Sequence, residues 1–238
     1  MLNQVIHWMQ MAGTVLEGLL LARILLLKLQ RVYLWVTLYW AINLLVDVSA
    51  WTVGFESQEA LRLFFYTRFV FAVLYPLAAW DVFEEISKQI AKLRKVHSMR
   101  LMSSLLTTAI FGFIASMLID DQDSLSIPRP VAFMGAFLWL GSASACLLFT
   151  WNVRRAVRKQ PPIMPHNTSV WAIFFLLTFM RAILDCGMLF AQPLFAPGIF
   201  DGIEIVFSSF DIGLAVWCLL KLRALPSDAA SLPETAAS

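Results

Sequence analysis

The chain has 238 residues, of which 60% are hydrophobic and 14% charged, and its formal net charge is +2. A soluble domain with a mean hydropathy of +0.74 would have too little polar surface to stay in solution, so the composition excludes an ordinary soluble fold. The small net charge averages loops of opposite sign and predicts no nucleic-acid partner. We therefore expect the lipid bilayer to surround most of this protein.

Seven apolar segments are each long enough to cross a bilayer core of about 30 Å as a helix, which takes roughly 20 residues. In chain order they are 5–27, 32–55, 61–83, 101–119, 131–152, 169–192 and 199–220. Because lipid offers no water to unpaired backbone groups, each segment is predicted to be helical. The sequence thus predicts an all-α membrane protein, with a seven-transmembrane-helix bundle over 1–222 and a short polar tail over 223–238.

The basic residues predict the orientation of this bundle. They gather in the gaps after the first, third, fifth and seventh segments, whereas the alternate gaps are acidic. In these four gaps they are Lys28 and Arg31, then Lys88, Lys92, Arg94, Lys95 and Arg100, then Arg154, Arg155, Arg158 and Lys159, and finally Lys221 and Arg223. The positive-inside rule assigns basic gaps to the cytoplasm. We therefore expect an outside N-terminus, a cytoplasmic C-terminus and a multi-pass location in the inner (cytoplasmic) cell membrane.

Polar residues within the segments recur at helical spacing, which marks the faces turned toward the bundle interior, because such groups are costly against lipid. The stripes are His7, Gln10, Thr14 and Glu17, then Trp40, Asn43 and Asp47, then Arg68 and Tyr75, then Thr178, Arg181 and Asp185, and finally Asp201, Glu204, Ser208 and Asp211. The rise of about 1.5 Å per residue places their charges between the midplane and the outer edge. We therefore predict an outward-open pocket for a ligand or proton, lined by Glu17, Asp47, Arg68, Arg181, Asp185, Glu204 and Asp211.

A structural role competes with this interpretation. Arg181 and Asp185 are four residues apart and could pair on one helix, and Arg68 could pair with Asp47 between helices. Glu204 lies close enough to the outer interface to be solvated without any pocket. Two mid-span carboxyls, Glu17 and Asp211, have no opposite charge on their own helix, which makes them the strongest functional candidates. Since carboxyls outnumber arginines, we expect some of them to be protonated or hydrated.

Two segments are candidate contact surfaces. The stretch 84–100 continues the third helix as a basic amphipathic extension, which predicts binding to anionic headgroups or, alternatively, to a cytoplasmic protein partner. In the fourth segment Ser104, Thr108, Gly112 and Ser116 recur every four residues. Such a row of small residues predicts close helix packing, with a homodimer through this helix as the alternative.

No catalytic or cofactor signature occurs in the sequence. No segment has a Lys near its centre for a retinal Schiff base, and the three histidines, at positions 7, 97 and 166, do not form a haem-binding pair inside the bilayer. Gly-x-Ser-x-Gly and His-Glu-x-x-His strings are absent. Cys146, Cys186 and Cys218 each lie alone in a segment, so neither a disulfide nor a metal site is expected. The sequence favours a non-enzymatic protein without a cofactor.

The runs LLLARILLLKLQRVYLWVTLYW, LFFYTRFVFAVL and AAWDVFEEI, within residues 18–119, resemble a group of uncharacterised seven-helix integral membrane proteins of soil bacteria. The resemblance implies the fold and the location, and it carries no activity or ligand.

Three functions remain open. The leading hypothesis is a sensor or signalling-type protein, in which the pocket binds a small ligand or a proton and the basic cytoplasmic surface passes the change to another protein. The first alternative is a cation- or proton-coupled transporter with Glu17 and Asp211 as its relay. The second alternative is a membrane-embedded lipid-modifying enzyme, although no nucleophile and base pair is recognisable.

Overall fold

A computed structural model gives the fold, and it describes residues 2–54, 57–89, 129–157, 165–191 and 197–225, together with the helical positions Leu106, Ile110, Phe113 and Ile114. The helices are α1 (Leu2–Leu26), η1 (Leu29–Arg31), α2 (Leu34–Val53), α3 (Gln58–Gln89), α5 (Arg129–Val157), α6 (His166–Ala191) and α7 (Pro197–Lys221). Over these ranges the chain contains no strand. Six of the helices are long and apolar enough to cross a membrane, which indicates an all-helical, multi-pass membrane protein.

These six helices coincide with six of the seven predicted segments. The third continues past its predicted end, as expected from the amphipathic pattern, and is described as far as Gln89. The predicted fourth segment, 101–119, lies outside the described residues except for the four positions named above. The same holds for its row of small residues, for 90–100 and for the tail from 226 onward, so the homodimer surface and the cytoplasmic docking surface stay predictions.

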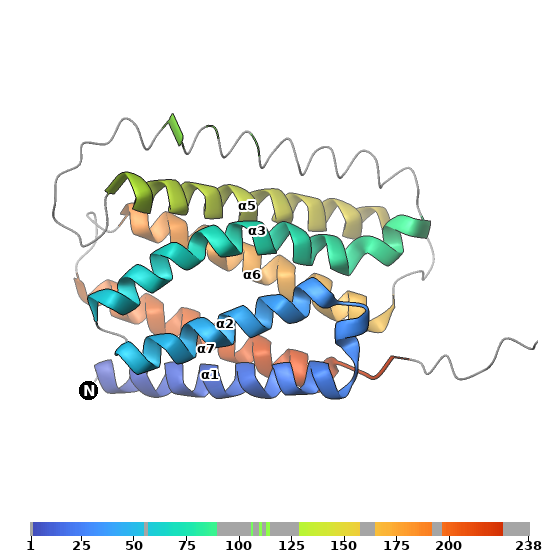
Figure 1. The fold of residues 1–238 in the computed structure, drawn as a ribbon, viewed down its shortest axis with the longest axis horizontal. Coiled ribbons are helices and arrows are strands. Elements are labelled where there is room, and N and C mark those ends of the chain that lie inside the picture. The colour runs from blue at the N-terminus through green and yellow to red at the C-terminus, as the bar shows by residue number, and fades with distance from the viewer. Residues whose placement is uncertain are drawn as a thin grey trace, which may run out of the picture.

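The six helices form a ring (Figure 1). Around it α1 contacts α2, α2 contacts α3, α3 contacts α5, α5 contacts α6, α6 contacts α7, and α7 returns to α1. A further contact joins α3 to α6. Figure 1 shows that α1, α3, α5 and α7 run in one direction and that α2 and α6 run in the other. The first and last helices are therefore neighbours, and their contact closes the ring.

Basic residues gather where α1, α3, α5 and α7 finish and where α2 and α6 begin, and we call this the basic end. Its described members are Arg23, Lys28, Arg31, Lys88, Arg154, Arg155, Lys221 and Arg223. This end is the one that the sequence assigns to the cytoplasm.

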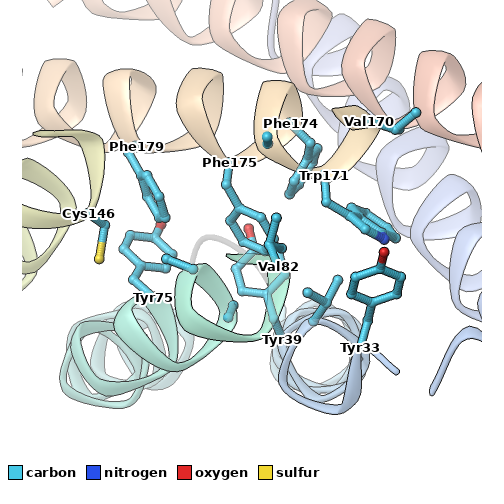
Figure 2. Packing of buried hydrophobic residues seen from close by; sticks show 14 of the residues in the cluster. Tyr33, Tyr39, Tyr75, Val82, Cys146, Val170, Trp171, Phe174, Phe175 and Phe179 are labelled. Carbon is cyan, nitrogen blue, oxygen red and sulfur yellow. The ribbon is translucent and has the colours of Figure 1, made fainter. Parts of the chain in front are cut away.

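Aromatic side chains pack against one another in the bundle interior (Figure 2). The Tyr39 ring contacts the rings of Phe71, Tyr75, Phe174 and Phe175 at centroid distances of 5.6–6.2 Å. Each such pair contributes about 0.5–1.5 kcal/mol beyond the burial of its surface. We call these five residues the aromatic layer, and it joins α2, α3 and α6.

Pro76 interrupts the hydrogen bonding of α3 in mid-helix. A proline has no N–H, so the carbonyl of Ala72, four residues earlier, loses its helical partner. The hydroxyl of Ser142, a fully buried residue of α5, donates to this carbonyl at 2.7 Å. Lipid cannot supply such a hydrogen bond. Ser142 therefore replaces the helical hydrogen bond that Pro76 removes, and it joins α5 to α3.

The start of α2 is capped by another helix. Tyr33, the residue before α2, offers no side-chain cap. The Asp81 carboxylate of α3 instead accepts hydrogen bonds from the backbone N–H groups of Trp35, at 2.8 Å, and Val36, at 3.4 Å. A carboxylate at this position satisfies free N–H groups and interacts favourably with the helix dipole. Asp81 is 7% exposed, so the cap is shielded from solvent.

We expect Asp81→Ala to lower the free energy of unfolding by about 1–3 kcal/mol, because two shielded N–H groups lose their acceptor. Asp81→Asn keeps one acceptor oxygen and should lose clearly less. Thermal unfolding in detergent measures both variants. Equal losses would show that the cap is not the source of the stability.

The end of α7 is fixed by side chains of α1 and α6. Three consecutive backbone carbonyls there each accept a side-chain hydrogen bond. The donors are His166 Nε2 to Lys221 O at 2.8 Å, Arg23 Nη2 to Leu222 O at 2.8 Å, and Asn167 Nδ2 to Arg223 O at 2.7 Å. Carbonyls at the end of a helix lack partners within it, so these bonds hold α7 firmly at the basic end.

Candidate functional site

A cavity of about 710 Å³ lies inside the helix ring. Its lining residues fall within 9–17 of α1, 40–47 of α2, 64–75 of α3, 174–188 of α6 and 203–215 of α7, and Trp139 of α5 joins them. The cavity therefore sits away from the basic end. All seven predicted pocket residues line it, namely Glu17, Asp47, Arg68, Arg181, Asp185, Glu204 and Asp211. Its volume is within the range of small-molecule sites, about 300–1,000 Å³.

Arg181 lies between two carboxylates of the cavity wall. It pairs with Asp185 one turn further along α6, as the sequence spacing predicted. Its Nε also lies 2.8 Å from Asp211 Oδ2 of α7. Asp211 has no opposite charge on its own helix, and the neighbouring α6 supplies one. The Asp211 side chain is 48% exposed, so the ion pair is accessible from the cavity.

The wall formed by α1 and α2 carries two carboxylates that contact only neutral donors. Asn43 Nδ2 donates to Glu17 Oε1 at 2.6 Å, and Thr14 Oγ1 donates to Asp47 Oδ2 at 3.2 Å. The other oxygen of Glu17, Oε2, is buried without a hydrogen-bond partner among the described residues. In that part of the chain, neither carboxylate forms an ion pair.

Arg68 lies on the α3 side of the cavity. Its guanidinium sits over the ring of Phe65, 4.4 Å from the centroid, and 5.5 Å from the centroid of Trp139. Over the described ranges no ion pair forms between Arg68 and Asp47, so that predicted alternative is not observed. Its Nη1 is buried with no hydrogen-bond partner there. Because arginine keeps its charge in proteins, a cation held by aromatic rings faces the cavity with an unused donor.

Glu204 lies at the exposed rim of the cavity, where its Oε1 accepts a hydrogen bond from Gln10 Nε2 at 3.3 Å. This bond connects α7 to α1. The side chain of Asp201, the first member of the predicted stripe, lies outside the described residues. Glu204 therefore lines the cavity by position. Its exposure also agrees with the alternative that it is simply solvated at the outer interface.

Aromatic rings form the floor of the cavity, toward the basic end. Trp40, Phe71, Tyr75 and Phe174 line the cavity, and each of these rings also contacts Tyr39 below them. The sequence placed Trp40 and Tyr75 on inward faces because they share stripes with polar residues. It gave no signal for Phe71 and Phe174, since 19 phenylalanines occur along the chain and none marks its own helix face.

No protein family, curated protein or solved structure matches this chain. What the cavity binds must therefore be inferred from its own geometry. Among the described residues, no three His, Cys, Asp or Glu side chains are arranged to hold a metal ion. The resemblance to membrane proteins of soil bacteria stays a prediction.

Proposed function

We propose that this protein is a seven-helix receptor of the inner cell membrane that binds a small polar ligand from the outer side. One observation carries the proposal: seven charged side chains from five helices line a single cavity. Charged groups inside a membrane protein are costly, and they usually mark binding sites or ion pathways.

The aromatic layer favours a receptor over a transporter. Tyr39, Tyr75 and Phe175 are 6%, 4% and 1% exposed, and the Tyr39 ring contacts the other two on the side of the cavity toward the basic end. A transporter would have to part these rings in every cycle to give its substrate alternating access. A receptor needs only a change in how its helices pack.

The directions of the helices support a seventh crossing and the proposed orientation. α3 ends at the basic end, whereas α5 begins at the opposite end (Figure 1). The predicted segment 101–119 fits between them. With the basic end in the cytoplasm, the cavity faces outward.

A route for the signal follows from the pairs between helices. A ligand that bridges the cavity walls would shift the helices that carry them, and the Arg181–Asp211 pair would pass this shift between α6 and α7. α7 ends at the basic end and α6 begins there, where His166 and Asn167 bond to the last carbonyls of α7. We infer that this end, together with the predicted surface 84–100, presents the change to a cytoplasmic partner.

The proposal predicts that water enters the cavity from outside. Gly13 lines the cavity, and a Cβ built there meets no atom within 4 Å, so Gly13→Cys adds a thiol without a clash. In intact cells this thiol should react with a membrane-impermeant cationic methanethiosulfonate. The native Cys146, Cys186 and Cys218 are buried and should give little background.

Gly213→Cys is the matched control. Gly213 is exposed on the spanning part of α7, does not line the cavity, and also has no atom within 4 Å of a built Cβ. Its thiol should face lipid and stay unlabelled. Equal labelling of the two variants would contradict a distinct aqueous cavity. Labelling of Gly13→Cys only after the membrane is opened would contradict the outward orientation.

A further inference from the structure

We propose that the cavity binds a dipolar organic molecule, with an ammonium group at one end, a carboxylate at the other and an apolar body between them. This inference rests on the proposed function, because it names the ligand class of the same cavity. It follows from two side chains of opposite charge, Arg68 and Glu17, that line different walls and each hold a polar atom without a hydrogen-bond partner in the described part of the chain.

Arg68 is the carboxylate-binding end. The rings of Phe65 and Trp139 contact the Arg68 guanidinium and hold it in place. The buried Nη1 of Arg68 has no hydrogen-bond partner among the described residues. A guanidinium is a planar fork of donors that matches the two oxygens of a carboxylate. Asp185 acts on Arg68 electrostatically, but it is already paired with Arg181. The donor of Arg68 is therefore available to a ligand.

Glu17 and Asp47 form the ammonium-binding end. Each carboxylate has a neutral donor on one oxygen, and Glu17 Oε2 is buried without a partner in the described part of the chain. An ammonium group supplies both the missing donors and the opposite charge. The ring of Trp40 lines the cavity on the same helix as Asp47, and an indole face attracts such a cation.

One ligand with both charges fits better than two separate ions. Arg181 is paired directly with two carboxylates, whereas Arg68 Nη1 and Glu17 Oε2 are buried without a hydrogen-bond partner among the described residues. Unpaired charges are costly where water is restricted, and a ligand without net charge satisfies both sites without adding a new one.

The arrangement of the helices separates the two charges of the ligand. α1 and α3 are not neighbours in the ring, since α2 lies between them. Side chains that enter one cavity from helices that are not neighbours favour an amine and a carboxylate at opposite ends of a molecule over both groups on one carbon atom. The cavity lining also includes Phe71, Phe174 and Phe207, which suits an apolar body. ω-Amino acids and short apolar peptides share this chemistry.

The test compares matched probes on the purified full chain in detergent. 6-Aminohexanoate carries both charges, whereas hexylamine and hexanoate each carry one. Leucyl-leucine, its N-acetyl form and its C-terminal amide make the same comparison for peptides. We expect the doubly charged member of at least one series to raise the thermal midpoint more than its singly charged relatives, and the series with the larger shift identifies the ligand source.

Two variants assign the two ends. Arg68→Gln should raise the apparent Kd of the doubly charged probe roughly 10- to 100-fold. The response to hexylamine should stay unchanged. Glu17→Gln should raise this Kd similarly and leave the response to hexanoate unchanged. Arg23→Gln is the control, because it removes the same charge outside the cavity, where Arg23 bonds to Leu222. It should preserve every probe response even if it lowers the basal midpoint.

Several outcomes would overturn this ligand class. They are equal shifts by hexylamine and 6-aminohexanoate, probe responses that Arg68→Gln leaves intact, and no shift by any probe in either series. The proposed function fails separately. If Gly13→Cys is labelled from outside, the outward-open cavity is supported even when the dipolar ligand class is wrong. If Gly13→Cys is not labelled, both the outward-open cavity and the dipolar ligand class are contradicted.

Discussion

Arg181→Met should lower the free energy of unfolding by about 3 kcal/mol, because it leaves two carboxylates of α6 and α7 without their common cation. This loss is at the lower end of the range of about 3–5 kcal/mol for breaking a buried ion pair. The reason is that the Asp211 side chain is 48% exposed and therefore partly hydrated. Thermal or denaturant unfolding in detergent measures it.

Asp211→Asn is the matched comparison, and it should cost only about 1 kcal/mol, because Arg181 keeps Asp185 as a partner. Combining Asp211→Asn with Arg181→Met should recover part of the stability lost in Arg181→Met alone, since fewer carboxylates are then unpaired. If Arg181→Met costs no more than Asp211→Asn, this cluster does not hold α6 to α7.

Ser142→Ala should cost about 1–3 kcal/mol, although it removes a single oxygen atom, because the Ala72 carbonyl is then left without a donor inside the bundle. Pro76→Ala tests whether the missing N–H of Pro76 is the cause of this loss. It restores a backbone N–H four residues after Ala72, so the helix can bond this carbonyl by itself.

In the Pro76→Ala background, Ser142→Ala should therefore cost much less than in the natural chain. The two substitutions form a double-mutant cycle whose coupling should be at least about 1 kcal/mol. Thermal midpoints of the four proteins give the result. Purely additive effects would show that Ser142 contributes through packing rather than through the proline.

The positions of the spans and the inward faces were predictable because both are local properties. A span requires only apolar length, and a mid-span charge such as Glu17 must turn away from lipid whatever the other helices do. Stripe spacing on five helices was therefore enough to select seven residues that line one cavity.

The partners of these residues were not predictable, because periodicity gives the face of a helix and not its neighbour. Asp211 looked unpaired since its partner, Arg181, lies on another helix. Arg68 looked ready to pair with Asp47 but is held by aromatic rings instead. Likewise, nothing in the spacing of α3 and α5 indicated that Ser142 bonds to the carbonyl freed by Pro76.

The contact between α1 and α7 has a consequence for biogenesis. A ribosome makes α1 before the other described helices and α7 after them, so the wall carrying Asp211 is missing until synthesis of the bundle is nearly complete. Until then, α2 is the only long helix among those described that contacts α1 and can shield its polar face, with Gln10 and Glu17, from lipid or from the insertion machinery. A ligand can consequently stabilise only chains that have inserted α7. A transcript truncated before this helix would yield a protein whose cavity lacks the α7 wall, and quality-control proteases should remove it.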